Sequence, residues 1–307
     1  MKVIASRAGR GSGNTYRSLL LVFLAAVTVR PVGAQVPQVD TLYYSERQPA
    51  WAGQLTVLAA NTFLGALTGG IAQELRGGSF RDGFTRGALG GAVTYLGKRV
   101  AVERFNGAGL IGRQVGALGS SMVRNAGDGI PTLDRLVVPL GVGRLYVRRG
   151  TDRAFQIQPK LDALATAWVL YGAIEDDLAF DAGASLSAGT FVFKTSNKVM
   201  LYGGGEHSAG GFANAGVVYL SDVPAWGRRF LDGAFAHERV HIVQEDQLFV
   251  TLTDPFEDWV VQQLPGGHHV SRWLDLNVST EIFRVTSRFF PSVRERPWEM
   301  EANYLSR

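Results

Sequence analysis

Two histidines and a glutamate within one short segment have the types and the spacing of a metal site. The segment is His237-Glu238-Arg239-Val240-His241, on a stripe of helical period. Side chains four residues apart share one face of a helix, so both imidazoles could reach one Zn²⁺ at about 2.0–2.1 Å. Glu238 points slightly off that face, toward a water molecule at the metal. The alternative is a helix with two solvated histidines, but the whole chain has only five histidines.

A catalytic zinc site needs a third protein ligand and an open position for water. Three other histidines are candidates by residue type alone: His207, His268 and His269. The segment Arg296-Pro-Trp-Glu-Met-Glu-Ala-Asn303 is a stronger candidate, because Pro297 favours the start of a helix and places Glu299 in its first turn. Glu301 competes with Glu299, since two glutamates two residues apart on a helix face different ways. Glu299 could also be an ordinary first-turn glutamate that favours the helix dipole.

Together the two segments resemble the gluzincin metallopeptidases, including small exported bacterial members. In several branches of that family a second helix carries Glu-x-x-Ala-Asp/Asn, which the segment Glu299-Met-Glu-Ala-Asn303 matches. Gln244, three residues after the second histidine, is also similar to the small bacterial members. The resemblance covers about residues 215–307. It implies that Glu299 is the third zinc ligand, that Glu238 is the general base, and that the substrate is a peptide or protein.

The same chemistry would need supporting groups around the metal. A donor to the developing oxyanion is required besides zinc, and the candidates are His268, His269 and Tyr304. A ligating histidine usually gives its second N–H to a carboxylate or carbonyl, for which the candidates are Gln244, Glu245 and Asp246. A solvated helix face explains Glu245 and Asp246 equally well. Arg239 is expected to point away from the metal. The short final helix would have to be anchored by inward packing of three residues: Trp298, Tyr304 and Leu305.

The histidine-bearing helix follows a region that is typical of an antiparallel sheet. Stretches rich in β-branched residues are separated by glycine-rich hairpin signals; the stretches are 136–147, 191–193, 199–202 and 215–220. Residues 161–173 are ambiguous between helix and strand. We expect the strand at 215–220, followed by a turn at 221–224, to lead into the helix. That strand could be a sheet edge to which an extended peptide substrate adds.

Residues 51–125 have a different composition, with small residues spaced four apart on helical segments. The pairs are Gly65 and Gly69, Gly87 and Gly91, and Gly112 and Gly116. Such spacing lets helix backbones approach closely, in membranes or in tight bundles. We expect a compact helical hairpin packed on the rest of the protein. Membrane apposition through 51–125 is the alternative, but charges within and between the helices disfavour it. Residues 35–130 could also cover the cleft until displaced.

The N-terminus reads as a secretory signal peptide over residues 1–34. A basic start precedes the apolar run 19–29 and a small-residue cleavage site at Val32-Gly33-Ala34. We therefore expect an exported protein, periplasmic or secreted, with a linker at 35–50. Without the leader, basic and acidic residues nearly balance, which excludes a nucleic-acid partner that needs a concentrated basic face. The chain has no cysteine, so its fold must rest on packing and on metal.

These features predict an α+β protein. A glycine-rich helical region at 51–130 would precede a β-sheet plus zincin-like metallopeptidase region at 131–307. The alternatives to a zinc metallopeptidase are a non-catalytic metal-binding protein and a membrane-associated envelope protein whose glycine-rich helices carry the function.

Overall fold

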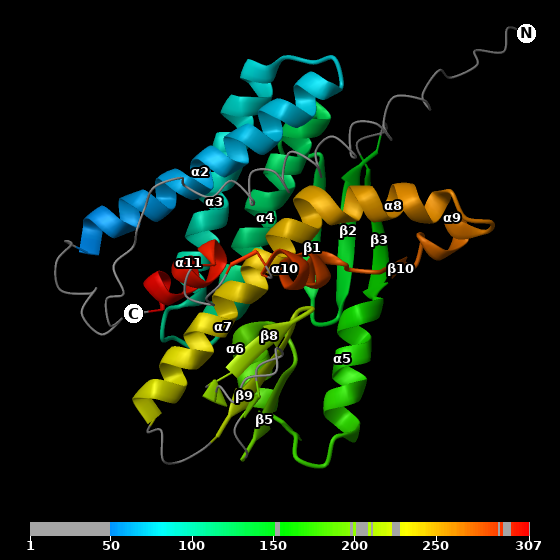
Figure 1. The fold of residues 1–307 in the computed structure, drawn as a ribbon. Helices are drawn as coiled ribbons and strands as arrows, with labels where there is room; N and C mark the ends of the chain where they lie inside the picture. Colours follow the sequence, from blue (N-terminus) through cyan, green and yellow to red (C-terminus); the bar gives the residue numbers. More distant parts are fainter. Residues whose placement is uncertain are drawn as a thin grey trace, which may run out of the picture.

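The computed structural model describes residues 50–150, 154–196, 199–200, 208–209, 211–222, 228–287, 289–290 and 296–306. Within them the expected α+β class is confirmed: helices come first, then sheets rich in antiparallel pairs, then C-terminal helices (Figure 1). The expected signal peptide, almost all of the linker, His207 and residues 223–224 of the expected turn lie outside the described residues.

The glycine-rich region forms three helices, and the third adds to the expected hairpin. They are α2 (Ala50–Leu75), α3 (Phe80–Ala101) and α4 (Ala108–Asp128). The glycines lie where the helices touch. A Cβ built on Gly87 would be 2.3 Å from the Gly65 carbonyl oxygen, and one on Gly91 would be 2.2 Å from the Asn61 carbonyl oxygen. Only residues without a Cβ allow such backbone contact, so the pattern reports helix packing. By length and hydropathy alone, Gly53–Leu75 could also cross a membrane.

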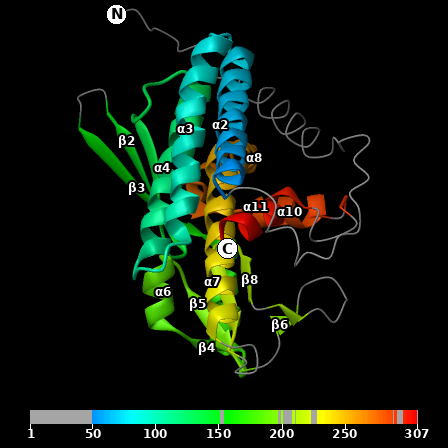
Figure 2. The same ribbon diagram turned by 90° about the vertical axis from the view of Figure 1, so that its left-hand side faces the viewer.

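The helix α7 (Arg228–Leu248) runs through the middle of the molecule, between the helical region and the sheets (Figures 1 and 2). Gly116 of α4 faces it, and a Cβ at that position would be 2.4 Å from Val243. Val240 of α7 is fully buried against Tyr95 of α3 and against Ala302 and Leu305. This packing fixes α7 against the glycine-rich helices on one side.

A first sheet has the order β1-β2-β3-β10. Its strands are β1 (Arg135–Leu140), β2 (Gly143–Arg149), β3 (Phe155–Asp162) and β10 (Leu274–Asp275); the last pairs parallel to β3 and the others are antiparallel. The segment 136–147, expected as a strand, is thus a hairpin with Gly141 at positive φ in its turn. The ambiguous segment resolves at Asp162, whose side chain accepts a hydrogen bond from Ala165 N and begins α5 (Ala163–Ile174).

A second sheet has the order β4-β5-β9-β8 and packs against α7 through β8 and β9. Its strands are β4 (Ala179–Phe180), β5 (Val192–Thr195), β9 (Val217–Ser221) and β8 (Gly211–Asn214), with α6 (Ala182–Ala188) between β4 and β5. The pair β5–β9 is parallel. A separate short pair joins β6 (Val199–Met200) and β7 (Ser208–Ala209).

The prediction that the strand at 215–220 is a sheet edge is wrong. Residues 215 and 216 form the turn of a β8–β9 hairpin, both with positive φ, as a two-residue type I′ turn requires. The strand β9 pairs with β5 on one side and β8 on the other, so it is interior, and β8 lies at the edge among the described strands. Every residue of β9 is buried, because β5 and β8 flank the strand and α7 packs against it.

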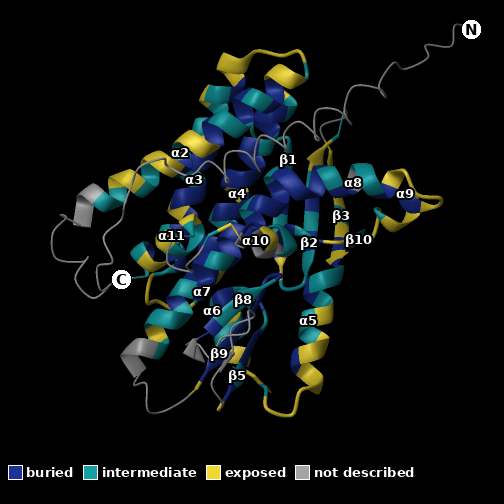
Figure 3. Cartoon of the chain, viewed as in Figure 1, coloured by how far each residue is buried: buried dark blue, intermediate teal, exposed yellow. Residues whose placement is uncertain are grey.

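The chain after α7 wraps around the first sheet and returns to α7. A π-helical turn, η2 (Phe249–Thr253), leads into α8 (Asp254–Gln262) and α9 (Gly267–Val270). After β10 come α10 (Ser279–Ser287) and the final helix α11 (Pro297–Leu305). Figure 3 shows α7 as mostly buried or half-buried, with the exposed residues gathered on the outer helices and on β3.

Candidate metal centre

The helix α7 presents both histidines of the motif to one point. His237 Nε2 and His241 Nε2 lie 2.9 Å apart, and the rings meet edge to face. The two side chains are 16% and 14% exposed, so the site is largely enclosed but reachable. This arrangement follows from their spacing, because one helical turn separates them.

The third group comes from α11, which begins at Pro297 as its sequence predicted. Glu299 Oε2 lies 3.2 Å from His237 Nε2 and 3.4 Å from His241 Nε2. A tetrahedral zinc ion with bonds of about 2.0–2.1 Å has ligand atoms about 3.3 Å apart. The three donor atoms therefore form a triangle of the size that zinc requires, with two nitrogens and one oxygen of the types it prefers.

Glu301, the competing glutamate, points elsewhere. Its carboxylate accepts hydrogen bonds from Asn61 Nδ2 at 2.6 Å and from Lys98 Nζ at 2.9 Å. Burial would raise the pKa of Glu301, but the Lys98 charge outweighs it and lowers that pKa. Glu301 is thus an ionised partner of a buried lysine, and it ties α11 to the glycine-rich helices α2 and α3.

Gln244 joins this ion pair to the metal site. Its Oε1 lies 2.7 Å from His241 Nδ1, and its Nε2 donates to Glu301 Oε2 at 2.8 Å. Since the amide oxygen only accepts, His241 must carry its proton on Nδ1, which leaves Nε2 free to bind a metal. The chain Lys98–Glu301–Gln244–His241 therefore fixes both the ring orientation and the tautomer of one expected ligand.

Glu238 lies beside the triangle without joining it. Its side chain is buried against β8, where it accepts a hydrogen bond from the Ala213 backbone N–H. A Cβ on Gly211 would be 3.1 Å from Glu238 Cγ, so this glycine makes room for the glutamate. Burial raises the pKa of Glu238 above its ordinary value. A carboxylate with a raised pKa accepts a proton more readily, as a general base must.

Opposite charges link His241 and Glu299, two members of the triangle. Burial disfavours the charged forms of both His241 and Glu299, but their attraction outweighs it. The Glu299 carboxylate raises the pKa of His241 to about 9, and His241 lowers the pKa of Glu299. Glu299 thus remains an anion at neutral pH, and a dication would replace the proton held between these groups.

The expected anchors of α11 lie largely where the sequence placed them. Leu305 is buried in the cluster around Val240, and Tyr304 packs against the same cluster. Tyr304 also occupies the space over Gly53 of α2. Trp298 is half-buried and meets Phe290 edge to face, with ring centroids 5.7 Å apart. A short terminal helix is thereby held against α7.

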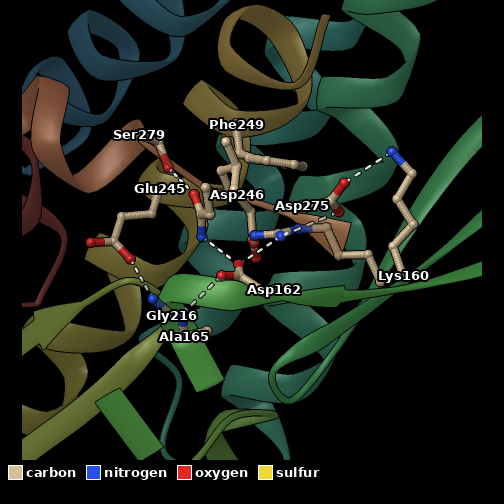
Figure 4. Close-up of polar contacts among 12 residues, drawn as sticks. Lys160, Asp162, Ala165, Gly216, Glu245, Asp246, Phe249, Asp275 and Ser279 are labelled. Carbon is tan, nitrogen blue, oxygen red and sulfur yellow. Dashed lines mark hydrogen bonds and ion pairs between the residues drawn. The ribbon is translucent and has the colours of Figure 1, made fainter. Parts of the chain in front are cut away.

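The remaining predicted site residues are not brought to the triangle. His268 and His269 lie on α9, exposed, on the opposite side of the molecule from α11 in Figure 1. Glu245 accepts from Gly216 N at 2.7 Å and so holds the β8–β9 turn, as Figure 4 shows, and Asp246 pairs with Arg113 Nε at 2.6 Å. Neither is solvated, and neither orients a histidine. Arg239 reaches the Glu103 carbonyl, away from the metal site as expected.

Sequence reasoning missed the roles of Lys98 and Asn61. Asn61 is a polar residue within the first glycine-rich helix, and Lys98 is followed by Arg99 near the end of the second. Both side chains are buried and converge on Glu301. The available signal was a pair of polar residues inside helices that otherwise pack through glycine.

Comparisons with protein-family models, with curated proteins and with solved structures found no match to this chain. The assignment of function therefore depends on the geometry above.

Proposed function

We propose that this protein is a zinc-dependent metallopeptidase that acts outside the cytoplasm. The observation that carries the proposal is the triangle of His237 Nε2, His241 Nε2 and Glu299 Oε2, with edges of 2.9, 3.2 and 3.4 Å. Glu238 lies next to it in a site that raises its pKa. The N-terminal pattern of a secretory signal supports export.

Each residue of the site would have its own role in peptide hydrolysis. His237, His241 and Glu299 would hold Zn²⁺, which would activate water and polarise the scissile carbonyl when bound. Glu238 takes the proton of the attacking water and passes it to the leaving nitrogen. Gln244 keeps His241 in the tautomer that binds metal. Because Glu238 is not part of the triangle, its loss should impair chemistry and leave metal binding intact.

The edge strand β8 offers a place for an extended substrate. Asn214 and Val217 flank the two-residue turn, so the Ala213 amide points away from β9 and toward Glu238. A peptide that adds to this edge would pass beside the general base. Hydrogen exchange of residues 211–214 should slow when an uncleaved peptide is added to Glu238→Gln, and unchanged exchange would rule out this binding mode.

The direct test compares Glu238→Gln with the wild-type protein on a peptide library. We expect the wild type to cleave peptides and to stop when zinc is removed by a chelator. The variant should lose about 10²–10⁴-fold in kcat while it keeps its zinc. Glu103→Gln, on the half-exposed Glu103 side chain, is the matched control and should retain activity. Zinc binding without any hydrolysis would instead favour a non-catalytic metal-binding protein.

A further inference from the structure

The first sheet carries its charge inside and its apolar residues outside. The face toward α4 and η2 presents Arg144, Tyr146, Lys160 and Asp162, all buried. Sheets of soluble proteins usually have the reverse pattern, with the apolar face toward the core. Ion pairs therefore hold β2 and β3 on the inner face, beside an apolar cluster of Val137, Tyr146, Phe249 and Val250. The outer face lacks a covering layer from the described elements.

The inner face explains how the reversal is tolerated. Arg144 Nη1 lies 2.6 Å from Asp162 Oδ2. Lys160 Nζ lies 3.0 Å from Asp275 Oδ1, as Figure 4 shows. Arg113 and Arg124 of α4 pair with Asp246 and Asp254. Every buried charge of this face thus has an opposite charge nearby. These pairs keep the polar side chains of β2 and β3 in the interior. The alternation of a strand then forces the apolar residues outward.

The outer face is a continuous apolar surface. The register places Leu136, Val147 and Ile157 in one row, and Leu140, Gly143 and Leu161 in another. Four of its side chains remain largely exposed: Leu140 50%, Phe155 68%, Ile157 63% and Leu161 44%. Figure 2 shows β2 and β3 along one margin of the molecule, with α4 on their inner side. An exposed patch of this kind marks an interaction surface.

Exposed arginines lie at two margins of this face. Arg149 stands opposite Phe155 at one end of the face, where its backbone N–H donates to the Asp134 carbonyl at 2.9 Å. Arg272 and Trp273 are exposed next to β3, where Gln158 Nε2 donates to the Arg272 carbonyl at 2.8 Å. The rows of the face contain no acidic residue. An apolar centre with arginine and tryptophan at its rim is the pattern of a surface that rests on lipid headgroups.

We propose that the outer face of the β1-β2-β3 sheet docks the protein on an anionic lipid surface. Apolar side chains of β3 enter the acyl boundary, and Arg149 and Arg272 contact lipid phosphates. A second copy of the chain is the competing occupant, and the measurement without vesicles below distinguishes it. The inference is independent of the metal site, and it concerns a different surface from the glycine-rich helices.

The experiment uses the absence of cysteine in the sequence. Ile157→Cys in the full chain carries a single environment-sensitive fluorophore, and Leu161→Cys provides a second position if the first variant folds poorly. Gln156→Cys, exposed on the opposite face of β3, is the matched control. Leu96→Cys, 53% exposed on α3, reports membrane contact through the helices. The vesicles contain phosphatidylglycerol or only phosphatidylcholine, each with a spin-labelled quenching lipid.

We expect fluorescence at position 157 or 161 to rise severalfold with phosphatidylglycerol vesicles and to be quenched by the spin label. The signal at 156 should change much less, and phosphatidylcholine or high salt should abolish the effect. Arg149→Gln should weaken it severalfold. Quenching at 96 without quenching at 157 or 161 would overturn the proposal, as would no quenching at either β3 position. A rise that follows protein concentration without vesicles would show self-association instead and would also overturn it.

Discussion

At the scale of single residues, the proposed metal site depends on hydrogen bonds as much as on its proposed ligands. Gln244 is buried and uses both ends of its amide, one on His241 and the other on Glu301. Trp298 O is a further acceptor for the same Nε2, at 3.1 Å. Partners of this kind orient a ligating imidazole and raise its affinity for metal.

Replacing Gln244 should therefore weaken metal binding without removing a ligand. For Gln244→Leu we expect the zinc dissociation constant to rise about 10–100-fold, measured by competition with a chelating dye. The electronic spectrum of the cobalt-substituted protein should also change, because His241 can rotate. Gln247→Leu, on the same helix and half-buried, is the control. Equal affinity and equal spectra in both variants would show that Gln244 only packs.

The sequence was informative for residues whose spacing is local. His237 and His241 are one turn apart, and any helix brings them together. Glu299 was inferred from resemblance, and its helix start from Pro297. The partners of Glu301 could not be predicted, because Lys98 and Asn61 reach it only through the packing of three helices. The same holds for Glu245 and Asp246, whose partners Gly216 and Arg113 lie far away in the sequence.

At the scale of elements, the glycine spacing determines how closely helices approach. The contacts of α2 with α3 run backbone to backbone at Gly65, Gly69, Gly87 and Gly91. That closeness matters for the site, because it brings Asn61 of α2 and Lys98 of α3 to the same carboxylate of α11. A separation of the two helices would break this three-way contact.

A single methyl group added at the contact between α2 and α3 should show that the protein depends on this close approach. Gly91→Ala places a Cβ 2.2 Å from the Asn61 carbonyl oxygen, and we expect it to lower the free energy of unfolding by about 1–3 kcal/mol. Gly233→Ala in α7 is the matched control, since a Cβ there meets nothing within 4 Å. It should be neutral or should stabilise by up to about 1 kcal/mol. Urea unfolding measures both, and equal effects would contradict the packing argument.

Strand positions were less predictable than helices. The β-branched stretches located most strands, but pairing partners are set by contacts that no local pattern encodes. An edge position was the hypothesis for β9, yet β5, from earlier in the chain, pairs with it in parallel. Similarly, the short β10 completes the first sheet from a position more than one hundred residues later in the chain.

At the scale of the whole molecule, one buried set of charges joins α4, the first sheet and the chain after α7. Tyr146 Oη lies 3.0 Å from Asp254 Oδ1 and 2.9 Å from Asp275 Oδ2. Burial, with Asp254 next, raises the pKa of Asp275 to about 6. Close by, Glu257 accepts hydrogen bonds from the N–H groups of Leu276, Asn277 and Val278. Burial nevertheless raises its pKa to about 7.

Glu257 should make stability depend on pH. Its pKa is higher in the folded chain than in the unfolded chain, so the folded state binds the extra proton. Its stabilising contribution is complete below about pH 4.5 and is lost as the pH rises through about 7. As the pH rises over this window, the free energy of unfolding of the wild type should fall by about 2–3 kcal/mol more than that of Glu257→Gln. Urea titrations at several pH values measure the difference, and parallel pH profiles would contradict it.

The proposed hydrolysis depends on one zinc ion at the triangle. Mass spectrometry of the purified chain, after reconstitution with zinc and desalting, measures the metal content directly. We expect one zinc in the wild type and in Glu238→Gln, and none in His241→Ala or Glu299→Ala. The exposed His268→Ala and His269→Ala should keep the zinc. A wild type that holds no zinc after reconstitution, or a Glu299→Ala variant that binds it as tightly as the wild type, would contradict the account.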